Sequence, residues 1–205
     1  MILYEKIKIE KKIIMSRLML VEPSLEYRED AINYILESLE ADGHCNGVGG
    51  LHRYLDNYEG WLEYLEYCRN YVADNERVPS LEYLLVREED NRIVGMINIR
   101  LSLNESLERL GGHIGYSIRP SERRQGYNRI NLYLALLICR EYGIDRVVLD
   151  CNRDNLGSSR SMMALGGRLI REWADEREGE CQRYEINVLE SLEENEERYR
   201  SLVLR

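Results

Sequence analysis

The stretch Gly112-His-Ile-Gly-Tyr-Ser-Ile-Arg-Pro-Ser-Glu-Arg-Arg-Gln-Gly-Tyr-Asn128 decides the fold class of this chain. It is typical of a strand, a polar loop and the start of an amphipathic helix over 130–142. The first turn of a helix offers unpaired N–H groups and the positive end of the helix dipole, which together favour a phosphate. Gly126 lets the backbone approach such a group, and Arg123 and Arg124 add positive charge. On spacing alone, a surface turn with two solvated arginines is the more frequent structure.

The residues on either side of this stretch predict alternating strands and helices. Upstream we expect a strand from Leu18, helices over 27–41 and 51–71, and a hairpin with strands over 83–87 and 92–99. Downstream we expect a buried strand at 147–149, a short helix over 158–165 behind Asn155, and a last hairpin over 168–173 and 183–188. The charged segment 189–205 is expected to be a helical tail or a partner-binding helix.

The run Ile118-x-Pro120-x-x-Arg123-Arg124-Gln125-Gly126-Tyr127-Asn128 resembles the signature of the GNAT acetyltransferases. The segments 97–100, 111–124 and 154–155, with the glycine pair at 166–167, resemble a bacterial subgroup of that family, over about residues 20–188. The resemblance implies an α/β (α+β) GNAT fold: a central mixed, mostly antiparallel sheet, splayed between two strands, with helices on both faces. We expect an N-terminal extension over 1–16, an acyltransferase domain over 17–188 and a tail over 189–205.

The resemblance also implies acetyl-CoA as co-substrate and no metal. Its pantetheine arm would pair with the strand over 116–118, its pyrophosphate would lie on the loop, and the strand at 147–149 would splay away to leave room. Asn155 would contact the cofactor, although it can equally be a helix cap. The implied cofactor-binding residues are Tyr116, Ser117, Ile118, Arg123, Arg124, Gln125, Gly126, Tyr127, Asn128, Arg129, Asn155 and Ser158.

The catalytic groups are less well defined by the sequence. An amine must lose a proton before it attacks a thioester, so we expect a base near the strand ends. The candidates are His113, Asp150 and Glu122, with Tyr116 as a fallback. His113 has the most suitable ordinary pKa but can be structural, and Asp150 can cap a turn.

Three residues depart from the family pattern. Met162 stands where many members have a tyrosine that protonates the departing thiolate, Leu101 stands where the subgroup has histidine, and Asn128 replaces glycine or alanine. These departures keep a second hypothesis open, a degenerate domain that binds acetyl-CoA as a sensor or scaffold without turnover. A third hypothesis is an interaction protein without any cofactor.

Composition narrows the partners. The net charge of −9 disfavours nucleic acids and favours a cationic amine acceptor, on a small molecule or a peptide. No apolar run is long enough to span a bilayer, and the 5 cysteines form neither a disulfide framework nor a zinc motif, so we expect a cytoplasmic protein. Formation of a homodimer is left open. Acceptor choice is expected to lie with the variable region 41–79, whose aromatic residues can line a pocket or fill the core: Trp61, Tyr64, Tyr67 and Tyr71.

Overall fold

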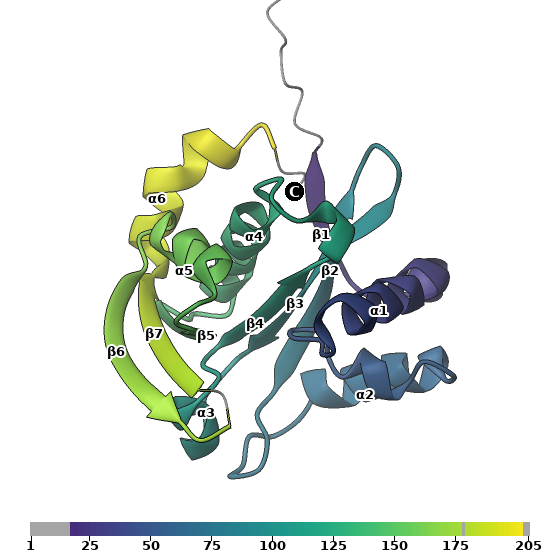
Figure 1. Cartoon of the computed structure of the whole chain (residues 1–205), viewed down its shortest axis with the longest axis horizontal. Coiled ribbons are helices and arrows are strands. Elements are labelled where there is room, and N and C mark those ends of the chain that lie inside the picture. The colour runs from purple at the N-terminus through teal and green to yellow at the C-terminus, as the bar shows by residue number, and fades with distance from the viewer. Residues whose placement is uncertain (1–16, 178, 203–205) are drawn as a thin grey trace, which may run out of the picture.

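The computed structural model describes residues 17–177 and 179–202 of the chain. The strands form two sheets: helices cover both faces of the first sheet, whereas the second lies at the outer edge of the molecule (Figure 1). The first sheet has the order β1 (Leu18–Val21), β2 (Ser80–Arg87), β3 (Arg92–Arg100), β4 (Ile114–Ile118). The second has the order β5 (Arg146–Asn152), β7 (Gly179–Asn187), β6 (Arg168–Asp175). The helices are α1 (Arg28–Asp42), α2 (Tyr58–Arg69), α3 (Glu105–Arg109), α4 (Tyr127–Glu141), α5 (Leu156–Met163) and α6 (Val188–Tyr199).

The expected fold class is confirmed, with one difference in strand pairing. Every ladder between described strands is antiparallel, so the parallel pairing implied by a mixed sheet is not found among them. The N-terminal extension expected over 1–16 lies outside the described residues.

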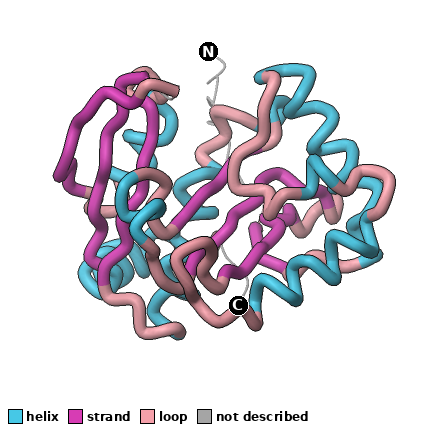
Figure 2. The backbone as a smooth tube through the Cα atoms, turned by 90° about the horizontal axis from the view of Figure 1, so that it is seen from below, coloured by secondary structure: helices cyan, strands magenta, loops and turns pink. Residues whose placement is uncertain are grey.

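The central hairpin of β2 and β3 supplies two hydrophobic cores. Leu85 and Ile97 point to the core beneath α4, whereas Leu84 and Met96 point to the core beneath α1 and α2. Because both faces of the hairpin are covered, its strands are almost continuously apolar in the sequence. Figure 2 shows helices on both sides of the central strands.

The helix expected over 51–71 is interrupted. Leu51–Arg53 forms a 3-10 turn, and α2 begins only at Tyr58. Asn57 ends the irregular segment because its side-chain oxygen caps the helix, accepting a hydrogen bond from the Gly60 N–H at 3.1 Å. The short helix α3, which the sequence analysis did not predict, begins in the same way behind Asn104.

The helix expected within the charged tail is present as α6, and it packs on the core. Val188 and Leu192 are buried, and the ring of Tyr199 lies 4.8 Å from that of Tyr133 in α4. The described part of the tail therefore covers the domain instead of projecting from it, while the domain boundary at 188 stays a prediction. Within residues 17–177 and 179–202, no helix is long and apolar enough to cross a membrane.

Candidate functional site

The two sheets separate between β4 and β5, and a cavity opens where they part. The strands touch at an isolated bridge between Gly112 and Leu149, supported by the His113 N–H, which donates to the Val148 carbonyl at 2.8 Å. Beyond this bridge lies a cavity of about 690 Å³. It is lined by the end of β4, the loop that follows, the first turns of α4 and α5, and the C-terminal end of α1. The splay expected from the sequence is therefore present.

Eleven of the twelve residues expected to bind the cofactor line this single cavity. They are Tyr116, Ser117, Ile118, Arg123, Arg124, Gly126, Tyr127, Asn128, Arg129, Asn155 and Ser158. Gln125 is not among the lining residues. Whether these side chains bind a cofactor stays a prediction, but the structure does bring them together.

The loop before α4 has a backbone suited to anions. Arg124 and Gly126 both have left-handed backbones, with φ of 66° and 82°. Gly126 is the N-cap of α4, and no side chain caps this helix, so the first N–H groups of α4 remain available to a ligand. Glycine adopts this left-handed backbone without strain. An added Cβ on Gly126 would meet nothing within 4 Å, so the space beside this residue is open to a ligand.

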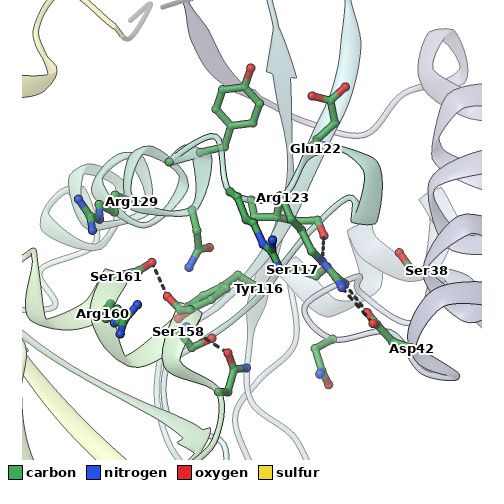
Figure 3. Close-up of a pocket in the computed structure, with 18 of the residues that line it drawn as sticks. Ser38, Asp42, Tyr116, Ser117, Glu122, Arg123, Arg129, Ser158, Arg160 and Ser161 are labelled. Atoms are coloured by element: carbon green, nitrogen blue, oxygen red, sulfur yellow. Dashed lines mark hydrogen bonds and ion pairs between the residues drawn. The ribbon is translucent and has the colours of Figure 1, made fainter.

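Four arginines line the cavity and differ in their partners (Figure 3). Arg123 forms an ion pair with Asp42 at the end of α1 and donates to the Ile118 carbonyl at 3.3 Å. This guanidinium lowers the pKa of Asp42. Arg124, Arg129 and Arg160 make no ion pair with any residue that the structure describes. Three positive charges are thus free to meet a ligand in a chain whose net charge is −9.

The Tyr116 hydroxyl and the Asn128 side-chain oxygen are buried beside the α4 N-terminus, and neither makes a hydrogen bond of ordinary geometry with the described residues, although Ser158 and Asn128 lie near the hydroxyl. Burial raises the pKa of Tyr116 to about 12, although nearby Ser158 and Asn128 act in the opposite direction. The phenol therefore stays protonated at neutral pH. Buried polar groups without a well-formed hydrogen bond are uncommon, so both atoms are available to a polar ligand in the cavity.

The cap role considered for Asn155 is present. Its side-chain oxygen accepts a hydrogen bond from the Ser158 N–H at 3.1 Å at the start of α5, and the residue also lines the cavity. Sequence reasoning missed Arg160 on the same helix, as well as Asp42 at the end of α1 and His44 in the loop that follows. The only local signal for Arg160 was its place just after the first turn of a helix already assigned to the site.

His113 lies at the closed end of the splay and does not line the cavity. Its Nδ1 accepts a hydrogen bond from the Val148 N–H at 3.1 Å. Burial lowers the pKa of His113 to about 4, and the charges of Arg100 and Arg183 act in the same direction. The neutral ring must then carry its proton on Nε2, so neither nitrogen is available as a base. These contacts make His113 a structural residue that holds β4 to β5.

Asp150 is also fully engaged, in a way that the sequence analysis did not foresee. Its two oxygens accept hydrogen bonds from Nε and Nη2 of Arg183, both at 2.7 Å, and the Gly111 N–H donates to Oδ2 at 2.7 Å. Both side chains are less than a tenth exposed. Asp150 therefore connects the backbone of Gly111, shortly after α3, to Arg183 in β7. It neither caps the next turn nor serves as a free base.

Glu122, the remaining candidate base, is likewise constrained, and neither Cys151 nor Met162 offers a substitute. Glu122 lines the mouth of the cavity but pairs with Arg87 at 2.7 Å and with Arg92 at 3.3 Å. Cys151 is buried, and burial raises the pKa of its thiol to about 11, so it is not an activated nucleophile. Met162 is buried and does not line the cavity.

Comparisons with known proteins agree with this geometry. The model of the acetyltransferase (GNAT) domain family matches residues 17–168. No curated protein matches the chain. Mycobacterium smegmatis RimJ in complex with CoA-disulfide is similar in structure, with a TM-score of 0.62 and 14% identity over 86% of this chain and 88% of that one.

Two further solved structures share the fold. RimL, a ribosomal L7/L12 alpha-N-protein acetyltransferase in complex with coenzyme A, has a TM-score of 0.60 and 16% identity over 83% of this chain and 94% of its own. A chimera of the spermidine N-acetyltransferase SpeG from Vibrio cholerae and hSSAT has a TM-score of 0.62 and 13% identity over 86% of this chain and 99% of its own. The resemblance, the fold and the enzyme class expected from the sequence are therefore confirmed: the chain belongs to the GNAT family of acetyltransferases.

Proposed function

We propose that the chain is an acetyl-CoA-dependent N-acetyltransferase that transfers an acetyl group directly to a primary amine. The observation that carries this proposal is the cavity between β4 and β5, where the uncapped α4 N-terminus lies among Arg124, Arg129 and Arg160. Structural neighbours named for an alpha-N-protein acetyltransferase and a spermidine N-acetyltransferase support an amine as the acceptor.

The residues present fit coenzyme A. The backbone of 124–128 and the three unpaired arginines suit the pyrophosphate. β4 is the edge strand of its sheet, so alternate N–H and C=O groups point away from β3 and can pair with the extended amides of pantetheine. The same edge can donate an N–H to the thioester carbonyl. Acetyl-CoA supplies the acetyl group in activated form.

Tyr116 is the side chain in the cavity best suited to proton transfer. Its raised pKa keeps the phenol protonated, so it can give a proton to the departing thiolate but cannot accept one from the amine at neutral pH. We therefore propose Tyr116 as the general acid. Changing Tyr116 to Phe should lower kcat about 100-fold while leaving coenzyme A affinity nearly unchanged. The matched control is Tyr184→Phe, which removes a buried hydroxyl that donates to Gln182 in β7.

Calorimetric titration of acetyl-CoA into the wild-type chain tests the binding site. Arg124→Ala should weaken binding about 10–100-fold, because a charge-assisted contact to phosphate is lost. Gly126→Glu should weaken it further, since it adds a negative charge and strains the left-handed backbone. Arg146→Ala is the control: this exposed arginine lies outside the cavity, with Glu185 at 3.8 Å. Binding that Arg124→Ala and Gly126→Glu leave intact would contradict the proposed site.

Binding without turnover is the second candidate, because Met162 is buried and offers no hydroxyl. Release of free thiol from acetyl-CoA in the presence of amines separates the two functions. Thiol release that depends on the amine supports the enzyme. Tight binding without such release would support a sensor or scaffold.

A further inference from the structure

A second cavity of about 290 Å³ adjoins the first. Its floor is formed by β2 and β3, and its walls by the loop over 45–53 and by α2. Cys45 and Asn46 line both cavities, so the two spaces meet at this loop. The loop lies directly on β4, because an added Cβ on Gly47 would stand 2.3 Å from the Gly115 carbonyl oxygen. A molecule in the second cavity would therefore lie next to the strand that borders the first.

The sequence predicts that the aromatic residues of the variable region 41–79 either line a pocket or fill the core, and the second cavity separates these roles for some of them. Tyr64 lines it, whereas Trp61 is buried in the core and Tyr67 is 55% exposed at the surface. The glycine-rich segment 47–50 is also part of the lining and leaves room that side chains would fill. The aromatic residues of α2 thus divide between core, cavity and surface.

The charges of this cavity oppose the net charge of the chain. Three basic side chains line the cavity, His52, Arg53 and Arg100. The other titratable side chains of the described lining are cysteines and a tyrosine. No aspartate or glutamate of the described chain lines it. The net charge of −9 favours a cationic acceptor, but what an acceptor meets at short range is this local lining.

Arg100 is the central charge of this cavity. Its Nη1 donates to the carbonyls of Gly111 at 3.2 Å and Gly112 at 2.8 Å, which fixes the guanidinium at the end of β3. It forms no ion pair with a carboxylate of the described residues. Burial lowers the pKa of Arg100, which shows that its charge is partly desolvated. A partly desolvated guanidinium that no carboxylate contacts directly is a strong site for an anion.

The two acidic groups that act on Arg100 do not neutralise it by direct contact. Asp150 is held by Arg183 and by the Gly111 N–H. Glu82 of β2 lies opposite Asn98, two residues along the strand from Ser80, which is the partner of Arg100. Its buried oxygens make no hydrogen bond of ordinary geometry with the described residues, although Asn98 lies close to them. Gly49 packs against this carboxyl, since an added Cβ on Gly49 would stand 2.8 Å from Oε2 of Glu82. Burial raises the pKa of Glu82 well above its ordinary range, which favours its neutral form.

We propose that the second cavity is the acceptor site and that Arg100 binds a carboxylate there, so that the acceptor is an amine that also carries an anionic group, as amino acids do. This inference rests on the proposed function, because it places the reacting amine at the junction by Cys45 and Asn46. Arg53, which is exposed, adds a second positive charge at the rim of the cavity. Arg100 is then a specificity residue, and it takes no part in the chemical step.

Three four-carbon amines that differ only at the far end test this proposal: 4-aminobutanoate, butylamine and 1,4-diaminobutane. Each is titrated by calorimetry into the full-length protein, alone and saturated with coenzyme A. We expect 4-aminobutanoate to bind about 10–100-fold more tightly than butylamine, as a charge-assisted pair with a desolvated guanidinium implies. The diamine should bind most weakly. Rates of acetyl transfer with acetyl-CoA should follow the same order.

Arg100→Gln should remove the preference for the carboxylate, and Arg100→Lys should retain part of it. Arg109→Gln is the matched control, because it removes the same charge from an exposed position outside both cavities. Affinity for acetyl-CoA, measured on the same samples, reports whether each variant is folded and whether the cofactor site works. Failure of acetyl-CoA to bind the wild type would refute the proposed function, and it would leave the preference among the three amines measurable.

Three results would overturn the proposal about Arg100. The first is butylamine or 1,4-diaminobutane binding the wild type as tightly as 4-aminobutanoate. The second is a preference for the carboxylate that persists in Arg100→Gln. The third is the absence of binding by all three amines to wild-type protein that binds acetyl-CoA.

Discussion

The two ends of the splay between β4 and β5 contain similar residue types in opposite states. At the closed end, Asp150 pairs with Arg183, and His113 is hydrogen-bonded to Val148. At the open end, among the described residues, Arg124 has no ion pair and the Tyr116 hydroxyl has no hydrogen bond of ordinary geometry. Polar groups that satisfy one another stabilise the fold, whereas those left unsatisfied are available to a ligand. Pairing, more than residue type, distinguishes the structural end from the functional one.

The largest effect is expected when the buried ion pair at the closed end is removed. Asp150→Ala leaves Arg183 buried without a counterion and the Gly111 N–H without its acceptor. Loss of one partner of a buried pair costs about 3–5 kcal/mol. Urea unfolding monitored by circular dichroism should show a decrease of this size in the free energy of unfolding.

The double variant Asp150→Leu with Arg183→Met is the control for this loss, since replacing both charges with apolar groups should restore much of the stability. If Asp150 were instead the catalytic base, the single variant would remain nearly as stable as wild type and would lose only turnover. That outcome would return Asp150 to the list of catalytic residues.

A comparison of paired and unpaired arginines within one cavity tests the effect of ion pairing at the open end. Arg160→Ala should weaken coenzyme A binding about tenfold, because its guanidinium is free to meet phosphate. Arg123→Ala should weaken it less, since Arg123 must first leave Asp42. Asp42→Asn should strengthen binding several-fold by releasing Arg123. Calorimetric titration measures all three, and equal losses for the two arginine variants would show that the ion pair has no influence on binding.

The open end was largely predictable from the sequence because its residues are local. The strand end, loop and first turn of α4 are consecutive between Tyr116 and Arg129, so one motif places nearly all of them. The hairpin of β2 and β3 was predictable for the same reason, since two apolar runs flank a four-residue polar turn. Periodicity also located α4, although its first turn begins before the apolar face does.

The closed end and the second cavity were not predictable, because their partners are distant in the chain. Nothing near Asp150 indicates Arg183, which reaches it only when β5 pairs with β7. Arg100 and Arg53 lie on different elements and meet at one cavity through the packing of the loop over β3. The packing of α6 on α4 depends likewise on tertiary contact, since its few apolar residues form no core alone.

The last effect that we predict concerns His113 and is confined to a window of pH. In the unfolded chain its pKa is about 6.5, and in the fold burial lowers it to about 4. As pH falls below 6.5, His113 becomes protonated in the unfolded chain but stays neutral in the native state. The free energy of unfolding therefore declines until about pH 4 and then levels off. After allowance for its partial exposure, this decline should amount to about 1–2 kcal/mol. His113→Asn keeps an acceptor for the Val148 N–H but does not titrate, so the difference in unfolding free energy between variant and wild type should change over that pH window. A constant difference across the window, or a loss of turnover in His113→Asn at neutral pH without loss of stability, would place His113 with the functional residues of the open end.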